Sequence, residues 1–352
     1  MTILFDPVRL GDLALANRIV MAPMTRSRAG PGDEPTALHV EYYRQRATAG
    51  LIVAEGTYPS KHGKGYCRTP GIHTAGQIRG WRTVTDAVHA EGGRIVLQLM
   101  HCGRIGSRLN KGPDAQTVAP SVIRARGRIF ADGVGMVDFD EPRALSAAEV
   151  PNVIGEFRVA TAKALAAGFD GVELHCASGY LPMQFLSTGT NRRTDRYGGP
   201  VENRIRFVVE TIEGMSDEAG SGRVGLRICP GNPFNDLHDD DPGETYSALL
   251  RAVTPMRLAY LHLIWLPTPE IDSLAVVKTH YQGALILNES VEHDGAQRLI
   301  ADGTTDAVSF GRPFIANPDL VRRFREGRRL ADFDPQTLYT PGPAGYIDYP
   351  AL

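Results

Sequence analysis

Eight short apolar segments recur along the 352-residue chain, and segments of helical character separate them. Several helical segments end in glycine, and Gly168 and Gly303 suit the left-handed conformation that follows a helix end. Strands that alternate with helices predict a parallel sheet, and eight repeats predict a closed (β/α)8 TIM barrel of the α/β class. We expect residues 1–352 to form one such domain, with an N-terminal hairpin ahead of the barrel. The expected barrel strands are 18–24, 51–56, 94–101, 171–176, 223–229, 259–264, 283–288 and 306–312.

Polar side chains stand at one end of several expected strands. In residues 171–176, the apolar Val172, Leu174 and Cys176 alternate with smaller or polar residues, so the two sets face opposite sides of the sheet. We expect the apolar set to meet the outer helices and the other set to face the barrel interior. Active sites of such barrels lie at the carboxyl ends of the strands. Four polar residues at these ends are therefore candidates: Gln98, His175, Arg227 and Arg312.

The connection from residue 103 to residue 146 is too long for a plain loop between a strand and a helix. Apolar residues are spread through it, which favours an ordered segment, and connections of this length are often functional lids. Within it, the segment APSVIRARGRIF, residues 119–130, is expected to form a hairpin over the mouth of the barrel.

The composition argues against several kinds of protein. A net charge of −2 gives no electrostatic reason to expect nucleic acid or an anionic membrane as a partner. No stretch approaches the roughly 18 apolar residues of a membrane span, and the N-terminus lacks a basic segment leading into an apolar run; we therefore expect a cytoplasmic protein. The cysteines are widely scattered, which disfavours a disulfide framework or a metal site: Cys67, Cys102, Cys176 and Cys229.

The segment ELHCASGYL, residues 173–181, gathers side chains that enzymes use as bases, nucleophiles and acids. Neighbouring residues of a strand point to opposite faces, so His175 is poorly placed to activate Cys176 as a nucleophile. Ser178 lies outside any G-x-S-x-G motif, which argues against a serine hydrolase. The chain also lacks the G-x-G-x-x-G fingerprint of Rossmann dinucleotide binding.

A set of motifs along nearly the whole chain resembles the Old Yellow Enzyme family of FMN-dependent ene-reductases, most of all N-ethylmaleimide and pentaerythritol tetranitrate reductases. The motifs are LFDPVRLGDLALANRIVMAPMTRSRA, KGYCRTPGIHT, LQLMHCGRI, AGFDGVELHCASGYLPMQFLS, NRRTDRYGGPVENR, FGRPFIANPDL and GYIDYPAL. The resemblance implies a bound FMN and NADPH or NADH as co-substrate. It also implies ping-pong hydride transfer through flavin N5 to an electron-poor alkene, an α,β-unsaturated carbonyl or nitro compound.

The resemblance also implies roles for residues around the flavin. Thr25 would bond flavin O4, Gly56 would approach the ring with its backbone, and Gln98 would bond the pyrimidine edge. Arg227 would lie against N1 and O2, where negative charge gathers on reduction. At residues 288–290 the chain departs from the glycines of many relatives. The full set of expected cofactor contacts is Pro23, Met24, Thr25, Gly56, Gln98, His175, Arg227, Asn288, Glu289, Gly311 and Arg312.

For the substrate, the resemblance implies that His175 polarises the carbonyl or nitro oxygen and that Tyr180 protonates the α-carbon. Relatives supply a second oxyanion donor where this chain has Ser178. Three outcomes stay open: a water bridges Ser178 to the substrate, the substrate sits differently, or the natural substrate is not a simple enone. Neutral drift in a working enzyme is an equal interpretation of Ser178. The serine also suggests the alternative of a specialised or redox-neutral, isomerase-type flavoenzyme of a biosynthetic pathway. The expected pocket residues are Tyr66, Met100, Phe234 and Tyr346.

Two further classes are disfavoured. A flavin-free aldolase barrel would need a lysine at a strand end, and the sequence shows none there. A non-catalytic binding protein would not need so many polar groups at the barrel mouth. The sequence does not choose between a monomer and a homodimer.

Overall fold

The computed structural model describes residues 3–266, 268–288 and 291–352. Over these residues, eight parallel strands close into a barrel in the order β10-β11-β12-β13-β14-β3-β4-β5. The (β/α)8 prediction and all eight predicted strand positions are confirmed. The barrel strands are β3 (Ile19–Met21), β4 (Leu51–Thr57), β5 (Ile95–Leu99), β10 (Gly171–Cys176), β11 (Val224–Ile228), β12 (Tyr260–Ile264), β13 (Leu285–Asn288) and β14 (Ala307–Phe310).

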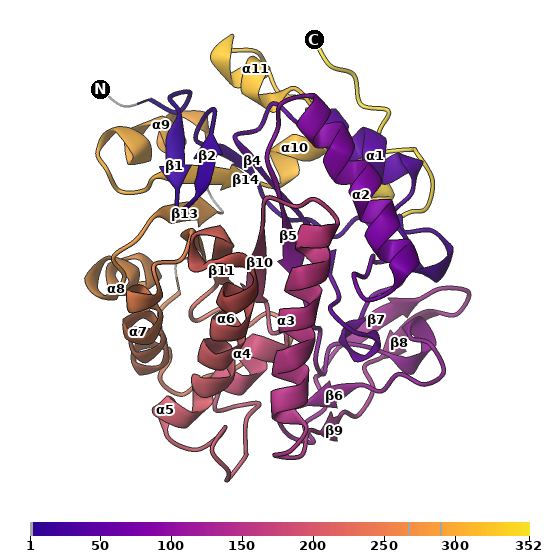
Figure 1. Cartoon of the computed structure of the whole chain (residues 1–352), viewed down its shortest axis with the longest axis vertical. Coiled ribbons are helices and arrows are strands. Elements are labelled where there is room, and N and C mark those ends of the chain that lie inside the picture. The colour runs from indigo at the N-terminus through magenta and orange to yellow at the C-terminus, as the bar shows by residue number, and fades with distance from the viewer. Residues whose placement is uncertain (1–2, 267, 289–290) are drawn as a thin grey trace.

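Helices follow the strands and surround the barrel (Figure 1). Their starts are locally encoded. Thr74, for example, caps α2 by accepting from the backbone N–H of Gln77, an interaction typically worth about 1 kcal/mol. The predicted left-handed glycines are confirmed, with φ of +88° at Gly168 and +75° at Gly303. The helices are α1 (Ala37–Arg44), α2 (Ala75–Ala90), α3 (Val150–Ala166), α4 (Leu181–Leu186), α5 (Val201–Arg204), α6 (Arg206–Ala219), α7 (Pro242–Val253), α8 (Ser273–His280), α9 (His293–Ala301), α10 (Arg312–Ala316) and α11 (Leu320–Arg325).

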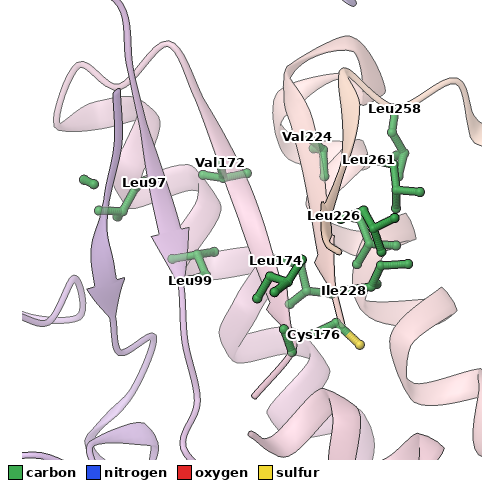
Figure 2. Packing of buried hydrophobic residues seen from close by; sticks show 14 of the residues in the cluster. Leu97, Leu99, Val172, Leu174, Cys176, Val224, Leu226, Ile228, Leu258 and Leu261 are labelled. Atoms are coloured by element: carbon green, nitrogen blue, oxygen red, sulfur yellow. The ribbon is translucent and has the colours of Figure 1, made fainter. Parts of the chain in front are cut away.

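The main hydrophobic core lies between the barrel wall and the helices. Val172, Leu174 and Cys176 of β10 all belong to it and are fully buried, and Figure 2 shows them beside Leu226 and other apolar residues of the neighbouring strands. Burying an aliphatic side chain of this size contributes about 1.5–3 kcal/mol, which fixes the register of each strand. The predicted alternation is therefore confirmed.

The N-terminal hairpin closes one end of the barrel. Strands β1 (Val8–Leu10) and β2 (Leu13–Leu15) pair antiparallel. Their leucines form a second core with Val20, Val96 and Tyr260, which come from three barrel strands. This plug leaves the carboxyl ends of the strands for the functional site.

The long insertion is ordered, but its hairpin is not where we predicted it. Strands β7 (Arg128–Ala131) and β8 (Gly135–Asp138) form the hairpin, so the predicted segment 119–130 supplies most of its first strand and none of its turn or second strand. Residues before it instead form β6 (Val118–Ala119), which pairs in parallel with β9 (Arg143–Ala144). The turn lies at Asp132–Val134 because Gly133 and Gly135 accept positive φ. Among the described residues, no helix is both long and apolar enough to cross a bilayer.

Candidate active site

Two adjoining cavities open at the carboxyl ends of the barrel strands. The first, here called the Arg312 cavity, has a volume of about 610 Å3, and the second, the His175 cavity, about 820 Å3. Pro23, Thr25 and Tyr339 lie on both, so the cavities are neighbours. The predicted residues on the Arg312 cavity are Pro23, Met24, Thr25, Arg227, Asn288, Gly311 and Arg312. Those on the His175 cavity are Pro23, Thr25, Tyr66, Gln98, Met100, His175, Ser178, Tyr180 and Phe234.

His175 and Tyr180 form the polar centre of the His175 cavity. Their rings contact edge to face with centroids 4.9 Å apart, and the Tyr180 hydroxyl lies 3.0 Å from that of Tyr66. Burial and the nearby Arg227 cation lower the pKa of His175 to about 3, so the ring is neutral at pH 7. Burial and Tyr66 raise the pKa of Tyr180 well above its ordinary value, so the phenol keeps its proton. The site therefore holds a neutral imidazole beside a protonated phenol.

Ser178 sits in a strained turn after β10. Its φ is +56°, a left-handed conformation that non-glycine residues adopt infrequently. Its backbone N–H donates to Cys229 Sγ at 3.0 Å, and its carbonyl accepts from the Asn235 side chain at 2.8 Å. At Gly179 a Cβ would lie 2.7 Å from the Phe234 carbonyl oxygen, so this turn requires glycine. The turn thereby presents Ser178 to the cavity.

A buried hydrogen-bond network crosses the barrel interior below both cavities. Glu173 accepts from Gln98 Nε2 at 2.8 Å, and its other oxygen lies 2.8 Å from His262 Nδ1. His262 Nε2 is 2.7 Å from the Ser309 hydroxyl. On the other side, Arg227 donates to the Asn288 side chain at 2.6 Å. The inward-facing polar residues thus come from six different strands.

The buried cysteine of this segment is not placed for nucleophilic chemistry. Cys176 is fully buried in the core behind β10 (Figure 2). Burial, together with the nearby Cys229, raises the pKa of its thiol well above the ordinary value, and a protonated thiol is a poor nucleophile. Cys176 thus faces the core while His175 lines the cavity, as predicted.

Comparison with known proteins decides which chemistry these cavities serve. The sequence profile of the NADH:flavin oxidoreductase / NADH oxidase family matches residues 3–331. The chain belongs to this family. It is 39% identical over 358 residues to a probable flavin mononucleotide-dependent alkene reductase of Leishmania infantum, covering 99% of this chain and 98% of that protein. It is also 39% identical to 12-oxophytodienoate reductase 1 of Oryza sativa subsp. japonica, covering 99% of this chain and 93% of the relative.

Solved structures of flavin oxidoreductases share the fold. Morphinone reductase in complex with tetrahydroNAD superposes with a TM-score of 0.95 at 44% identity, covering 100% of this chain and 98% of the other. The Old Yellow Enzyme homologue of Zymomonas mobilis gives a TM-score of 0.96 at 38% identity, with both chains fully covered. The predicted family, the predicted FMN-dependent oxidoreductase activity, and the predicted FMN and nicotinamide cofactors are confirmed.

The chain's own residues fit an FMN. A flavin phosphate needs cationic or N–H donors, and the Arg312 cavity has the exposed Arg312 on its wall for it, while Arg227 on the same wall offers a cation to the ring. The His175 cavity holds a buried ring nitrogen, His175 Nδ1, without a hydrogen-bond partner within the described ranges. Thr25 and Gln98, which can hydrogen-bond the edge of a flavin ring, line the same cavity. The Arg312 cavity therefore has groups that suit the phosphate of FMN, and the adjoining, larger His175 cavity has groups that suit the edge of its ring.

Two predicted site residues lie away from the cavities. Tyr346 is fully buried and stacks on Tyr42 with ring centroids 4.1 Å apart, so its expected place on the pocket is wrong. Gly56 lies on neither cavity wall; a Cβ there would meet Met100 Sδ at 2.6 Å. Its small size accommodates Met100, which does line the His175 cavity. Glu289 falls outside the described residues.

The tyrosine of the C-terminal segment that lines the pocket is Tyr339, seven positions before the predicted Tyr346. Two buried arginines of the loop after β3 determine this by holding the C-terminal segment through its backbone. Arg26 donates to the carbonyls of Leu338 and Gly345, and Arg28 donates to that of Leu338 at 2.7 Å. These long-range contacts place Tyr339 on both cavities. The only hint in the sequence was that Arg26 and Arg28 directly follow the predicted flavin contacts Pro23, Met24 and Thr25.

The hairpin of the insertion supplies further pocket residues that the sequence did not single out. Ile129, Phe130 and Met136 line the His175 cavity. Arg68 holds this hairpin through Asp132 and also donates to the Tyr339 carbonyl at 2.8 Å. The predicted position of the insertion over the mouth pointed to such contacts, but the hairpin register did not follow from the sequence.

Proposed function

We propose that the His175 cavity is the place where this enzyme reduces the activated C=C bond of a small electron-poor alkene, with electrons from NAD(P)H. The reaction class follows from the family, and the residue roles rest on one observation. His175 and Tyr180 lie together on one cavity, the first as a neutral ring and the second as a protonated phenol. This is the pair that polarisation of an oxygen and protonation of a carbon require.

Bound FMN supplies the hydride, which it takes from NAD(P)H. The residues proposed to hold the ring are Thr25 and Gln98, with Arg227 as the cation beside it; Gly311 and Arg312 are proposed for the phosphate. Arg227 is oriented by its bond to Asn288, whose amide also donates to the Ser309 carbonyl at 3.0 Å. Asn288 is thus proposed as a support for Arg227 rather than as a direct phosphate contact.

His175 is proposed to donate an N–H to the carbonyl or nitro oxygen of the substrate as that oxygen gains negative charge. A neutral ring has one N–H to donate. Because the pKa of His175 is lowered to about 3, the ring does not become a protonated imidazolium that would compete with Tyr180 as the proton donor. Tyr180 is proposed to donate its proton to the α-carbon, and Tyr66, whose hydroxyl is 3.0 Å away, orients the phenol.

The redox-neutral alternative is not favoured. The relatives named above are reductases, and the proton donor that a reduction needs is present on the cavity. Ser178 remains the single departure at the expected donor position.

The function is tested by spectroscopy of the purified protein. We expect a yellow protein that NADPH or NADH bleaches without oxygen and that 2-cyclohexenone then reoxidises, because both half-reactions use the same bound FMN. Stopped-flow absorbance in the flavin band measures each step. A colourless protein that takes up no added FMN would contradict the proposal, and bleaching without reoxidation by any activated alkene would contradict the substrate class.

Replacing Ser178 with Asn is expected to raise kcat/KM for 2-cyclohexenone by about tenfold, since loss of one oxyanion donor typically costs about 10²–10³ in rate and serine supplies at best part of that. Asparagine tolerates the left-handed backbone at this position better than most residues. The matched control is Ser178→Ala, which keeps the backbone but removes the hydroxyl. Unchanged or lower activity of Ser178→Asn would show that no donor is missing.

A further inference from the structure

We infer that Glu173 is a positioning residue that orients Gln98 and fixes the charge beneath the two cavities, and so tunes the binding and reduction of FMN. The inference rests on the proposed function, because Gln98 is there a flavin contact. It concerns a buried Ser309–His262–Glu173 row that the proposed chemistry does not use.

The row is built inside the barrel and links both cavities. Glu173 and His262 are fully buried, and Gln98 is 2% exposed. Gln98 lies on the wall of the His175 cavity, and Ser309 lies on the wall of the Arg312 cavity. Adjacent links measure 2.8, 2.8 and 2.7 Å. One continuous chain of hydrogen bonds therefore joins the two cavities.

The carboxylate determines which end of the Gln98 amide faces the cavity. An ionised carboxylate only accepts hydrogen bonds, so the NH2 group of Gln98 must point to Glu173. This fixes the amide plane and leaves the amide oxygen of Gln98 free to accept from an N–H group of a ligand, with the second N–H of the NH2 group beside it. Without Glu173, either end of the amide could face the cavity. Glu173 thus selects an acceptor at this position.

The row also carries a defined charge. Burial alone would raise the pKa of Glu173, but His262 and Arg227 outweigh it and the pKa is lowered. Burial and the Arg227 cation lower the pKa of His262. Glu173 is therefore ionised beside a neutral His262, whose Nδ1–H it accepts, while His262 Nε2 accepts from Ser309. One fixed negative charge partly offsets Arg227.

The same arrangement argues against a nucleophilic role. In a serine hydrolase the histidine must act at the cavity where the serine attacks, whereas His262 here is fully buried and lies on the wall of neither cavity. The Ser309 carbonyl is also bound by Asn288, so the residue is held from two sides. The row is internal and held by hydrogen bonds, as expected if Glu173 acts through Gln98 and does not touch the substrate itself.

Two variants test charge and orientation. Glu173→Gln keeps the shape but removes both the charge and the acceptor-only carboxylate that orients Gln98, since an amide can also donate. Because a negative charge near the electron acceptor disfavours reduction, we expect the variant to bind reduced FMN more tightly relative to oxidised FMN by about tenfold, a midpoint potential about 30 mV more positive for a two-electron couple. Glu173→Asp keeps the charge but shortens the reach to Gln98; we expect oxidised FMN to bind about tenfold more weakly with a nearly unchanged potential.

The measurements are FMN dissociation constants, from flavin fluorescence on adding FMN to the apoprotein, and midpoint potentials, from anaerobic titration against a reference dye. Glu213→Gln on the outer face of α6 is the control, since it removes the same charge from an exposed position. Circular dichroism of each apoprotein checks folding. If Glu173→Gln does not fold, Glu173→Asp still tests the orientation of Gln98, and combining it with Gln98→Ala should add no further loss of FMN affinity.

The outcomes are distinct. In both variants, an FMN affinity within twofold of that of the unaltered enzyme and a midpoint potential within about 9 mV, the same twofold for a two-electron couple, would overturn the inference while leaving the proposed function intact. Failure of the unaltered enzyme to bind FMN would instead refute the proposed function. Strict additivity of Glu173→Asp and Gln98→Ala would show that Glu173 does not act through Gln98.

Discussion

Replacing Tyr180 with Phe is expected to slow reduction of 2-cyclohexenone by about 10²–10⁴, the usual contribution of a positioned general acid. Tyr180 is 7% exposed and its hydroxyl contacts Tyr66 at 3.0 Å, so phenylalanine fits the same space and removes only the proton and its hydrogen bond. Reduction of the bound FMN by NADPH should be nearly unchanged, because that step needs no proton at the α-carbon. Stopped-flow measurement of the two half-reactions separates the effects.

Tyr66→Phe is the matched control for this prediction. It removes the partner hydroxyl but leaves the proposed acid, so a much smaller loss is expected. Equal loss in both half-reactions of Tyr180→Phe would mean that Tyr180 supports the structure of the cavity rather than supplying the proton. A strongly activated nitroalkene should be less sensitive to Tyr180→Phe than the enone, because its product anion needs the acid less.

Replacing His175 with Leu is expected to lower kcat/KM for 2-cyclohexenone by about 10²–10³, the cost of removing one oxyanion donor. His175→Gln restores an N–H donor at similar reach and should recover part of the loss. Because burial and Arg227 lower the pKa of His175 to about 3, its protonated form is negligible at neutral pH. In the unaltered enzyme the enone half-reaction should therefore show no step near pH 6.5, the value of an ordinary histidine.

The pH profile gives an independent check. A step near pH 6.5 that disappears in His175→Gln would show that the ring titrates and that the charged form takes part. Retention of full activity in His175→Leu would contradict the role of His175 altogether. Bound FMN in each variant, measured by its absorbance, shows whether the cavity itself has survived.

Much of the site was predictable because it depends on local patterns. Alternation along residues 171–176 placed His175 inward and Cys176 outward, since successive side chains of a strand point to opposite faces. The motif resemblance then identified Tyr180, and both residues lie on one cavity. The same alternation puts Glu173 inward, but only the structure shows that its carboxylate is bound by Gln98 and His262.

The two wrong predictions, the position of the hairpin and the place of Tyr346, concern features that depend on contacts between distant segments. The hairpin is formed by β7 and β8 and not by residues 119–130, because Gly133 and Gly135 set its turn. Arg68, which binds Asp132, holds the hairpin in place. Tyr346 could not be told from Tyr339 by spacing, since both lie in a segment without regular strand or helix. Backbone contacts from Arg26 and Arg28 decide between them.

The sequence by itself determined the barrel, the facing of its strands and the flavoenzyme family, because hydrophobic periodicity and ordered motifs are properties of neighbouring residues. Only the tertiary structure decided which side chains share a cavity, which tyrosine lines it and how Glu173 joins Gln98, His262 and Ser309. These relations arise when the closed barrel brings β5, β10, β12 and β14 around one interior. Closure in space, rather than order along the chain, makes them neighbours.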